Sequence, residues 1–307
     1  MTFQSIFRPN LFAGQTHIVT GGGSGIGRCT AHELAALGAT VALVGRRLEK
    51  LDEVREEIEY AGGRALCFAC DHRDEARVTA VVGEVLTATG CLDGLVNNAG
   101  GQFASPLASI SKKGWDAVVA NNLTGGFLFA REVYSQWMNA HGGAIVNIVA
   151  DNWGSMVGMG HSGAARAGMV SLTETAAVEW APSGVRVNAV APGWIASSGF
   201  ETYPEWMQPY LRVLHRAIPL QRLGTESEVS AAIVFLLSPA AAFISGTVLR
   251  VDGAAPNARL TSPLSALKDG SGSAPLPWPL DAHDRSTPWN AFPLHRPSGR
   301  SDNGDTD

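Results

Sequence analysis

The sequence has few charged residues and lacks a long apolar run. Lys, Arg, Asp and Glu make up 17% of the 307 residues, against 45% hydrophobic residues, a balance typical of a well-packed globular chain. Because no run of about 18 apolar residues occurs, we expect no membrane span. The formal net charge of −5 argues against a basic groove that binds nucleic acid.

Targeting signals are also missing. The apolar stretch in Met1–Arg8 is too short for a secretory signal, and Pro9 follows it. The last three residues, Asp305–Asp307, do not form a peroxisomal tripeptide. We therefore expect the protein to stay in the cytoplasm.

Cysteine is scarce, and the four cysteines include one Cys-x-x-Cys pair, Cys67 and Cys70. Such pairs occur in redox and metal sites. Here the pair lies in an apolar segment that predicts a strand, where positions three apart point to opposite faces. No second pair offers the remaining ligands of a zinc site. We therefore expect both cysteines to be structural and no metal to be bound.

Short apolar segments alternate with segments of helical periodicity along most of the chain. Alternation of this kind predicts an α/β fold, a single Rossmann-type doubly wound parallel sheet covered on both faces. The expected strands are 16–20, 41–44, 65–70, 94–97, 144–149, 185–191 and 247–251. The expected helices are 26–37, 48–60, 75–86, one long helix within 114–140, 162–180 and 226–237.

Composition divides the chain into three parts. We expect an N-terminal arm over 1–12, the Rossmann-type domain over 13–256, and an irregular tail over 257–307 that is rich in Pro, Ser, Gly and Asp. Within the domain, a small insertion at about 194–219 follows a strand end and contains five aromatic residues, Trp194 among them. Since substrates of open α/β sheets bind there, we interpret it as a substrate lid; a surface helix pair with inward aromatics is the alternative.

A glycine-rich turn joins the first expected strand to the first expected helix. Glycines at such a turn let backbone N–H groups reach a pyrophosphate at the N-terminus of the helix. The pattern predicts a dinucleotide site whose turn residues are Gly21, Ser24, Gly25, Ile26 and Gly27.

The second strand ends in two arginines instead of the acid that binds the ribose of NAD. Arg46 and Arg47 are suited to hold a 2′-phosphate, so the sequence favours NADP(H) over NAD(H); two solvated residues at a helix start are the alternative. Asp71, at the end of the third strand, is a candidate contact for the adenine or a helix cap.

Several motifs in order resemble the short-chain dehydrogenase/reductase family over residues 13–255. They are Thr20–Gly27, Asn97–Gly100, Asn121–Gly125 and Arg186–Gly193. The resemblance implies a cytoplasmic NAD(P)-dependent oxidoreductase that forms a homodimer or homotetramer. It also implies that Asn98, Ala99, Gly100, Pro192 and Gly193 lie against the cofactor.

The family's Tyr-x-x-x-Lys motif is missing. Most members use this tyrosine as the proton donor for carbonyl reduction, whereas Ser162 and Arg166 hold the two positions here. Val149 and Ala150 stand where a catalytic serine is expected, and only the family's asparagine, Asn122, is kept. A serine hydroxyl is a poor acid, and Arg166 acts only through its fixed charge, so ordinary ketone chemistry lacks its acid.

Reduction of a double bond conjugated to a thioester needs less acid, because oriented donors that stabilise the enolate oxygen suffice. The segments around Gln102, Asn122 and His161–Gly168 resemble the peroxisomal trans-2-enoyl-CoA reductase-like members of the family. The resemblance implies an NADPH-dependent enoyl-CoA reductase of fatty acid metabolism. Ser162 and Asn122 are then expected to bind the thioester oxygen, directly or through water, and Arg166 to orient the ribose and the nicotinamide. Gln102 and Trp194 are the expected substrate contacts, and His161 and Asp151 the candidate proton sources.

Two other interpretations stay open at this point. An alcohol or aldehyde dehydrogenase for an apolar substrate, such as a terpenoid, would take its acid from elsewhere. A non-catalytic NADP-binding protein would also keep the cofactor motifs and lack the acid.

Overall fold

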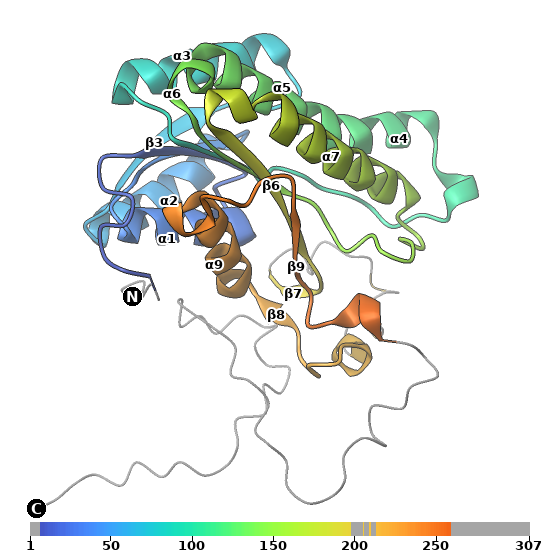
Figure 1. Ribbon diagram of the computed structural model, residues 1–307. Coiled ribbons are helices and arrows are strands. Elements are labelled where there is room, and N and C mark those ends of the chain that lie inside the picture. Colours follow the sequence, from blue (N-terminus) through green and yellow to red (C-terminus); the bar gives the residue numbers. More distant parts are fainter. Residues whose placement is uncertain (1–6, 198–204, 206–208, 210–212, 259–307) are drawn as a thin grey trace, which may run out of the picture.

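The computed structural model describes residues 7–197, 205, 209 and 213–258. Seven parallel strands form one sheet in the order β3-β2-β1-β4-β5-β6-β9, with helices on both faces (Figure 1). This strand order, which reverses between β1 and β4, is that of a doubly wound dinucleotide-binding fold and confirms the predicted fold class. The described strands are β1 Thr16–Thr20, β2 Thr40–Gly45, β3 Arg64–Ala69, β4 Gly94–Asn97, β5 Gly143–Ile148, β6 Val185–Pro192 and β9 Val248–Val251, with the small pair β7 Ile195–Ala196 and β8 Gly224–Thr225.

The helices divide between the two faces of the sheet, with α1, α2 and α9 on one face and α3, α5 and α7 on the other (Figure 1). The α-helices are α1 Gly25–Ala36, α2 Leu48–Tyr60, α3 Glu75–Thr89, α4 Lys112–Val119, α5 Gly125–Val133, α6 Asn139–His141, α7 Gly160–Glu179 and α9 Glu226–Leu237. Short 3-10 turns occupy η1 Leu107–Ser109, η4 Ala181–Ser183, η7 Leu214–Ala217, η8 Pro239–Ala241 and η9 Ala255–Asn257. None of the described helices is long and apolar enough to cross a membrane.

The expected long helix within 114–140 contains two π-helical turns, η2 Ala120–Thr124 and η3 Tyr134–Met138. A π-turn leaves carbonyls without the usual helical partner, and such turns are frequent at functional sites. In η2 the Asn122 side chain donates to the Val118 carbonyl. Apolar periodicity does not distinguish such a turn from the α-helix around it, so the sequence could not predict it.

Parts of the predicted domain plan fall outside the described residues. The arm over 1–6, most of the lid (198–204, 206–208 and 210–212) and the tail over 259–307 are among them. Of the arm, Phe12 is fully buried in the core, and its N–H donates to the Leu37 carbonyl. Packing of the domain therefore begins before residue 13.

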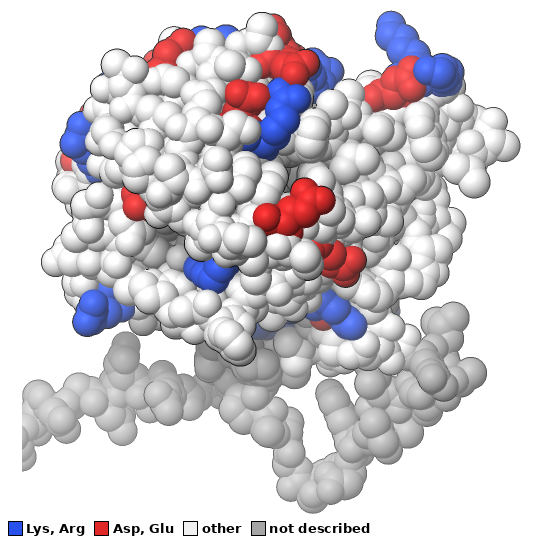
Figure 2. Space-filling view, turned by 45° about the horizontal axis from the view of Figure 1, so that its top comes forward, with Lys and Arg blue, Asp and Glu red and all other residues white. Residues whose placement is uncertain are grey.

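Charge is sparse on the face of the molecule in Figure 2. Lys and Arg lie in small clusters mixed with Asp and Glu, and uncharged side chains cover most of this face. This view therefore contains no extended basic stripe of the kind that a nucleic acid needs.

A histidine is buried inside β1, and its protonation should make stability depend on pH. Burial lowers the pKa of His17 from 6.5 to about 4, so the unfolded chain takes up the proton first as the pH falls. The free energy of unfolding should then drop by about 2 kcal/mol between pH 7 and pH 5. In urea unfolding at the two pH values, His17→Gln should remove most of this drop. His141→Gln, at an exposed position, is the control, and an unchanged drop in His17→Gln would contradict the assignment.

Candidate active site

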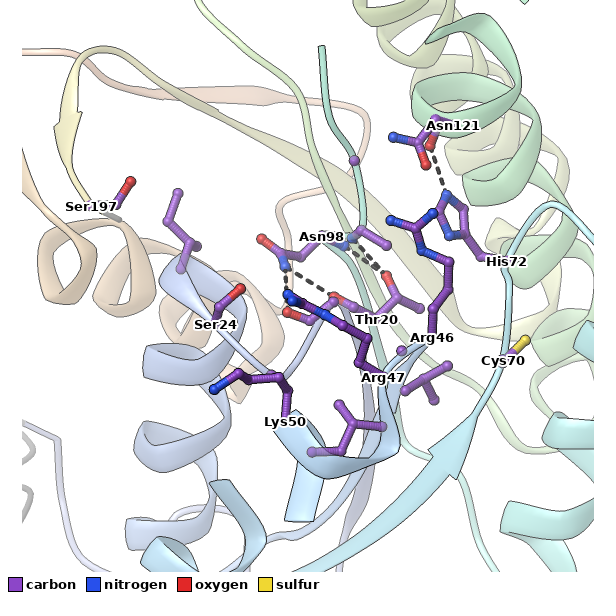
Figure 3. Close-up of a pocket in the computed structure, with 18 residues that line it drawn as sticks. Thr20, Ser24, Arg46, Arg47, Lys50, Cys70, His72, Asn98, Asn121 and Ser197 are labelled. Carbon is purple, nitrogen blue, oxygen red and sulfur yellow. Dashed lines mark hydrogen bonds between the residues drawn. The ribbon is translucent and has the colours of Figure 1, made fainter. Parts of the chain in front are cut away.

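A cavity of about 360 Å³ opens where the strand order reverses, at the carboxyl ends of β1, β2 and β4. Figure 3 shows polar and basic side chains that approach it from several elements. The predicted residues that line it are Gly21, Ser24, Ile26, Arg46, Arg47, Asn98, Ala99 and Gly100. It is also lined by residues that the sequence reasoning did not select, among them Thr20, Lys50, Cys70, His72, Asn121 and Ser197.

The glycine-rich turn needs glycine at its key positions, because of the backbone angle at some of them and of close packing at others. Gly21 and Gly25 have φ angles of +67° and +58°, which glycine adopts most easily. A Cβ at Gly27 would lie 2.4 Å from both the Gly21 carbonyl oxygen and Asn98 Nδ2. Helix α1 then begins at Gly25 without a side-chain cap from Ser24, which leaves first-turn N–H groups available to an anion. This cradle fits the pyrophosphate of a dinucleotide.

Three basic side chains stand at the end of β2. Arg46 extends toward His72, whereas Arg47 extends toward Asn98 (Figure 3). Lys50 lies in the first turn of α2, where its alkyl chain packs against Gly23. The sequence does not identify it as a cofactor contact, because Lys50 and Glu53 have the spacing of a common surface ion pair on a helix. The three cations fit the 2′-phosphate of NADP(H).

Asp71 is paired with a neighbouring arginine and does not cap α3. Its carboxylate binds the Arg73 guanidinium and accepts the Arg73 backbone N–H, and this pairing holds the pKa of Asp71 well below its usual range. Asp71 is absent from the cavity lining, and α3 is capped instead by Asp74, which accepts from Arg77 N. The helix-cap alternative for Asp71 is therefore wrong, whereas its contact with the adenine stays a prediction, because a carboxylate has acceptor sites beyond those that Arg73 uses.

His72 occupies the cavity wall beside it. The ring is buried, and its Nε2–H donates to the Asn121 carbonyl at 2.9 Å. A Cβ at Gly125 would lie 1.9 Å from the ring, so only glycine makes room for it. Burial lowers the pKa of His72, which keeps the ring neutral near pH 7. His72 therefore ties the end of β3 to the π-turn η2, next to the reactive centre.

Asn122 is held by the backbone. Its Nδ2 donates to the Gly101 and Val118 carbonyls at 2.7 and 2.9 Å, and its Oδ1 accepts the Gly101 N–H at 3.1 Å. Because a side-chain amide has two N–H donors, none is left for a substrate oxygen. A bond from Asn122 to the thioester oxygen, direct or through water, would have to replace one of these two bonds and stays a prediction. The described contacts show Asn122 fixing the position of Gly101.

Ser162 and Gln102 meet at the start of α7. Ser162 is fully buried, and its Oγ–H donates to Gln102 Oε1. His161 beside it is also fully buried, and its Nδ1 accepts the Ser162 N–H at 3.0 Å, while its Nε2 has no partner among the described residues. The Phe103 ring packs edge-on against His161 at 4.5 Å between centroids. The structure thus brings together Ser162, Gln102 and His161, which sequence reasoning had selected separately.

Arg166 lies one turn further along α7. Its Nη1 donates to the Ile148 carbonyl at the end of β5, and a Cβ at Gly100 would lie 2.8 Å from its Nη2. Burial lowers the pKa of the guanidinium to about 10, so it stays charged at neutral pH. The fixed charge expected from the sequence is therefore next to the cavity wall.

The remaining predicted residues lie beyond β5 and β6. Asp151 donates its N–H to the Pro192 carbonyl, and burial together with the nearby Asp252 raises the pKa of its carboxyl group. Gly193 packs against Asp252. Trp194 packs with Leu214, Ile218 and Leu223 and lines a second cavity of about 350 Å³. Pro192 and Gly193 are absent from the lining of the first cavity.

Gly100 gives a direct test of this geometry. A methyl group there would lie 2.7 Å from Asn122 Oδ1 and 2.8 Å from Arg166 Nη2, so Gly100→Ala should displace the segment that lines the cavity. We expect about tenfold weaker cofactor binding, since overpacking costs typically 1–3 kcal/mol. Fluorescence titration with NADPH would measure it. Gly83→Ala, whose Cβ meets only Gln136 Oε1 at 3.6 Å, is the control and should bind normally; equal affinity in both variants would contradict the geometry.

Comparison with known proteins shows the family of the chain. The model of the family described as "Enoyl-(Acyl carrier protein) reductase" matches residues 21–254. A probable 2,4-dienoyl-CoA reductase of Bacillus subtilis is 39% identical over 77% of this chain and 94% of its own. The chain belongs to the short-chain dehydrogenase/reductase family, whose members are NAD(P)-dependent oxidoreductases.

Two solved structures show the same fold. A citronellol catabolism dehydrogenase of Pseudomonas aeruginosa is 59% identical, with a TM-score of 0.75 over 83% of this chain and 100% of that chain. A putative NAD(P)-dependent gluconate 5-dehydrogenase of Beutenbergia cavernae, solved with bound NADP, is 35% identical, with a TM-score of 0.76 over 82% and 100% of the two chains.

Proposed function

We propose that the protein reduces the carbon–carbon double bond of a 2-enoyl-CoA with NADPH. The observation that carries the proposal is Ser162, a fully buried hydroxyl at the position where most family members hold an acidic tyrosine. Its hydrogen bond to Gln102 holds the hydroxyl oxygen in place at the start of α7, while its proton can turn to another acceptor. Such a group is a hydrogen-bond donor and not an acid, which suits the stabilisation of an enolate.

The chemistry is divided between the cofactor and the chain. The glycine-rich turn and the basic side chains after β2 would hold NADPH, which when bound would supply the hydride for the β-carbon of the substrate. Negative charge then develops on the thioester oxygen. The Ser162 hydroxyl turns from Gln102 to this oxygen, because a hydroxyl rotates freely to its best acceptor. Gln102 positions the acyl group, and Arg166 adds a fixed positive charge.

Two groups are candidates for the proton that completes the reduction at the α-carbon. His161 accepts the Ser162 N–H at Nδ1, so the neutral ring holds its proton at Nε2. Asp151 has a carboxyl group with a raised pKa and lies where β5 ends. We propose both as proton sources to be separated by mutation, and Trp194 as a substrate contact.

The setting proposed for this activity is a homodimer or homotetramer in the cytoplasm. Exposed apolar side chains on the outer helices support assembly: Phe127 on α5 and Val178 on α7 are 39% and 76% exposed. Burial of such side chains against a second copy would stabilise an oligomer.

An alcohol or aldehyde dehydrogenase for an apolar substrate is the second candidate. It is favoured by the 59% identity to a citronellol catabolism dehydrogenase, and its acid would have to be Asp151 or His161. A non-catalytic NADP-binding protein is the third candidate, since the cofactor cavity does not depend on an acid.

The test is NADPH oxidation with trans-2-enoyl-CoA esters of short and medium chain, run beside oxidation of alcohols, citronellol included, with NADP⁺ and NAD⁺. Loss of NADPH with enoyl-CoA alone would support the reductase. Oxidation of alcohols alone would overturn it in favour of the dehydrogenase. Binding of NADPH without either reaction would favour the non-catalytic protein.

A further inference from the structure

Arg166 is a buried cation without a counter-ion. Within the part of the chain that the structure describes, its Nε is fully covered and has no partner, and the guanidinium donates one hydrogen bond, to the neutral Ile148 carbonyl. Among residues 7–197, 205, 209 and 213–258, no carboxylate forms a salt bridge with it, and burial alone lowers its pKa. A cation buried in this way is costly, so the charge should act on a bound molecule.

The position of the guanidinium in the sheet indicates which part of a dinucleotide it meets. In doubly wound folds the pyrophosphate lies at the turn after the first strand, and the 2′-phosphate or 2′-hydroxyl is read after the second. Arg46 and Arg47 place the adenosine half on the β2 side of that turn. The other half must then extend over β4 and β5. Arg166 lies there, between the Ile148 carbonyl at the end of β5 and Gly100 after β4.

The oxidised and reduced cofactors differ in charge at that half alone. The nicotinamide ring of NADP⁺ carries a positive charge and that of NADPH is neutral, whereas the phosphates and the adenine are identical. We propose that the fixed charge of Arg166, next to the nicotinamide half, makes the protein bind NADPH more tightly than NADP⁺. This inference rests on the proposed NADP(H) cofactor but not on the proposed substrate.

As a consequence, the reduced cofactor would occupy the site more often than the oxidised one, which favours reduction of the substrate. Two unit charges several ångströms apart in a partly buried site repel enough to change an affinity by about tenfold. NADP⁺ would leave readily after turnover, and NADPH would occupy the site at equal concentrations. Arginine is suited to this because it keeps its charge at any physiological pH, whereas a lysine can lose its proton.

Calorimetric titration with NADPH and NADP⁺, without an acyl substrate, tests the inference. The parent protein should bind NADPH about tenfold more tightly, and Arg166→Met should bring the two dissociation constants to within about threefold, since only the charge difference is removed. 2′,5′-ADP, which lacks both the nicotinamide and its ribose, is the control ligand and should bind both proteins equally. Equal binding of the two cofactor forms by the parent, or an unchanged ratio in Arg166→Met, would overturn the inference.

A second variant covers the case in which Arg166→Met does not fold. Arg166→Lys keeps the charge near pH 7, so its ratio should match that of the parent there and should fall between pH 8 and pH 10 as the amine loses its proton. The parent ratio should stay constant over the same range, and a constant ratio in Arg166→Lys would count against the inference. If the parent protein bound neither NADPH nor NADP⁺, both the proposed function and this inference would be wrong.

Discussion

Replacing Ser162 with alanine should lower kcat for enoyl-CoA reduction about 100-fold, since loss of one donor to a developing oxyanion typically costs ~3 kcal/mol. NADPH affinity should stay within about twofold of the parent, because Ser162 is absent from the lining of the cofactor cavity. Steady-state kinetics with a saturating enoyl-CoA and fluorescence titration with NADPH would measure the two quantities.

Ser171→Ala is the matched control for this variant. Ser171 lies on the same helix at an exposed position, so its loss should leave kcat unchanged. Gln102→Leu should lower kcat less than Ser162→Ala, because Gln102 directs the hydroxyl but does not carry the donated proton in our proposal. Equal turnover in Ser162→Ala and the parent would remove Ser162 from the mechanism. A fall in NADPH affinity that matches the fall in kcat would indicate a structural role instead.

Much of the fold could be predicted from local pattern. The strands and the first helices follow from apolar runs and helical periodicity, and α2 Leu48–Tyr60 and α9 Glu226–Leu237 agree with the predicted 48–60 and 226–237. Helix α9 is also marked by its capping box, in which Thr225 and Glu228 bind one another's backbone N–H groups. These signals are local, so they require no knowledge of distant contacts.

The use of each polar side chain depends on tertiary contacts and could not be predicted in this way. Asn122 was identified as a site residue, but its amide is used by Gly101, 21 residues away. His72 was missed because its role depends on the Asn121 carbonyl and on the space left by Gly125. Asp71 has the position of an adenine contact but is paired with Arg73. A motif therefore predicts where a residue lies, whereas the neighbouring residues determine which of its hydrogen-bond donors and acceptors stay available to a ligand.

Removal of both arginines after β2 should change the choice of cofactor. In Arg46→Ala/Arg47→Ala, NADPH affinity should fall about 100-fold, because two charge-assisted hydrogen bonds to a phosphate contribute typically 1.5–3 kcal/mol each. NADH affinity should change by less than about threefold, since a ribose 2′-hydroxyl has no charge for the arginines to bind. Calorimetric titration of both cofactors, at one low and one physiological salt concentration, would measure the change in preference.

The matched control is Arg55→Ala/Arg64→Ala, which removes the same net charge from residues that do not line the cavity. It separates a local contact with the phosphate from the general field of the protein, which salt screens. The two single variants would show how much of the NADPH affinity depends on each arginine. They need not be equal, because Arg47 extends toward Asn98, whereas Arg46 extends toward His72 (Figure 3). Unchanged NADPH affinity in the double variant would mean that the arginines are only the solvated start of α2, and that the 2′-phosphate is held by Lys50 or not at all.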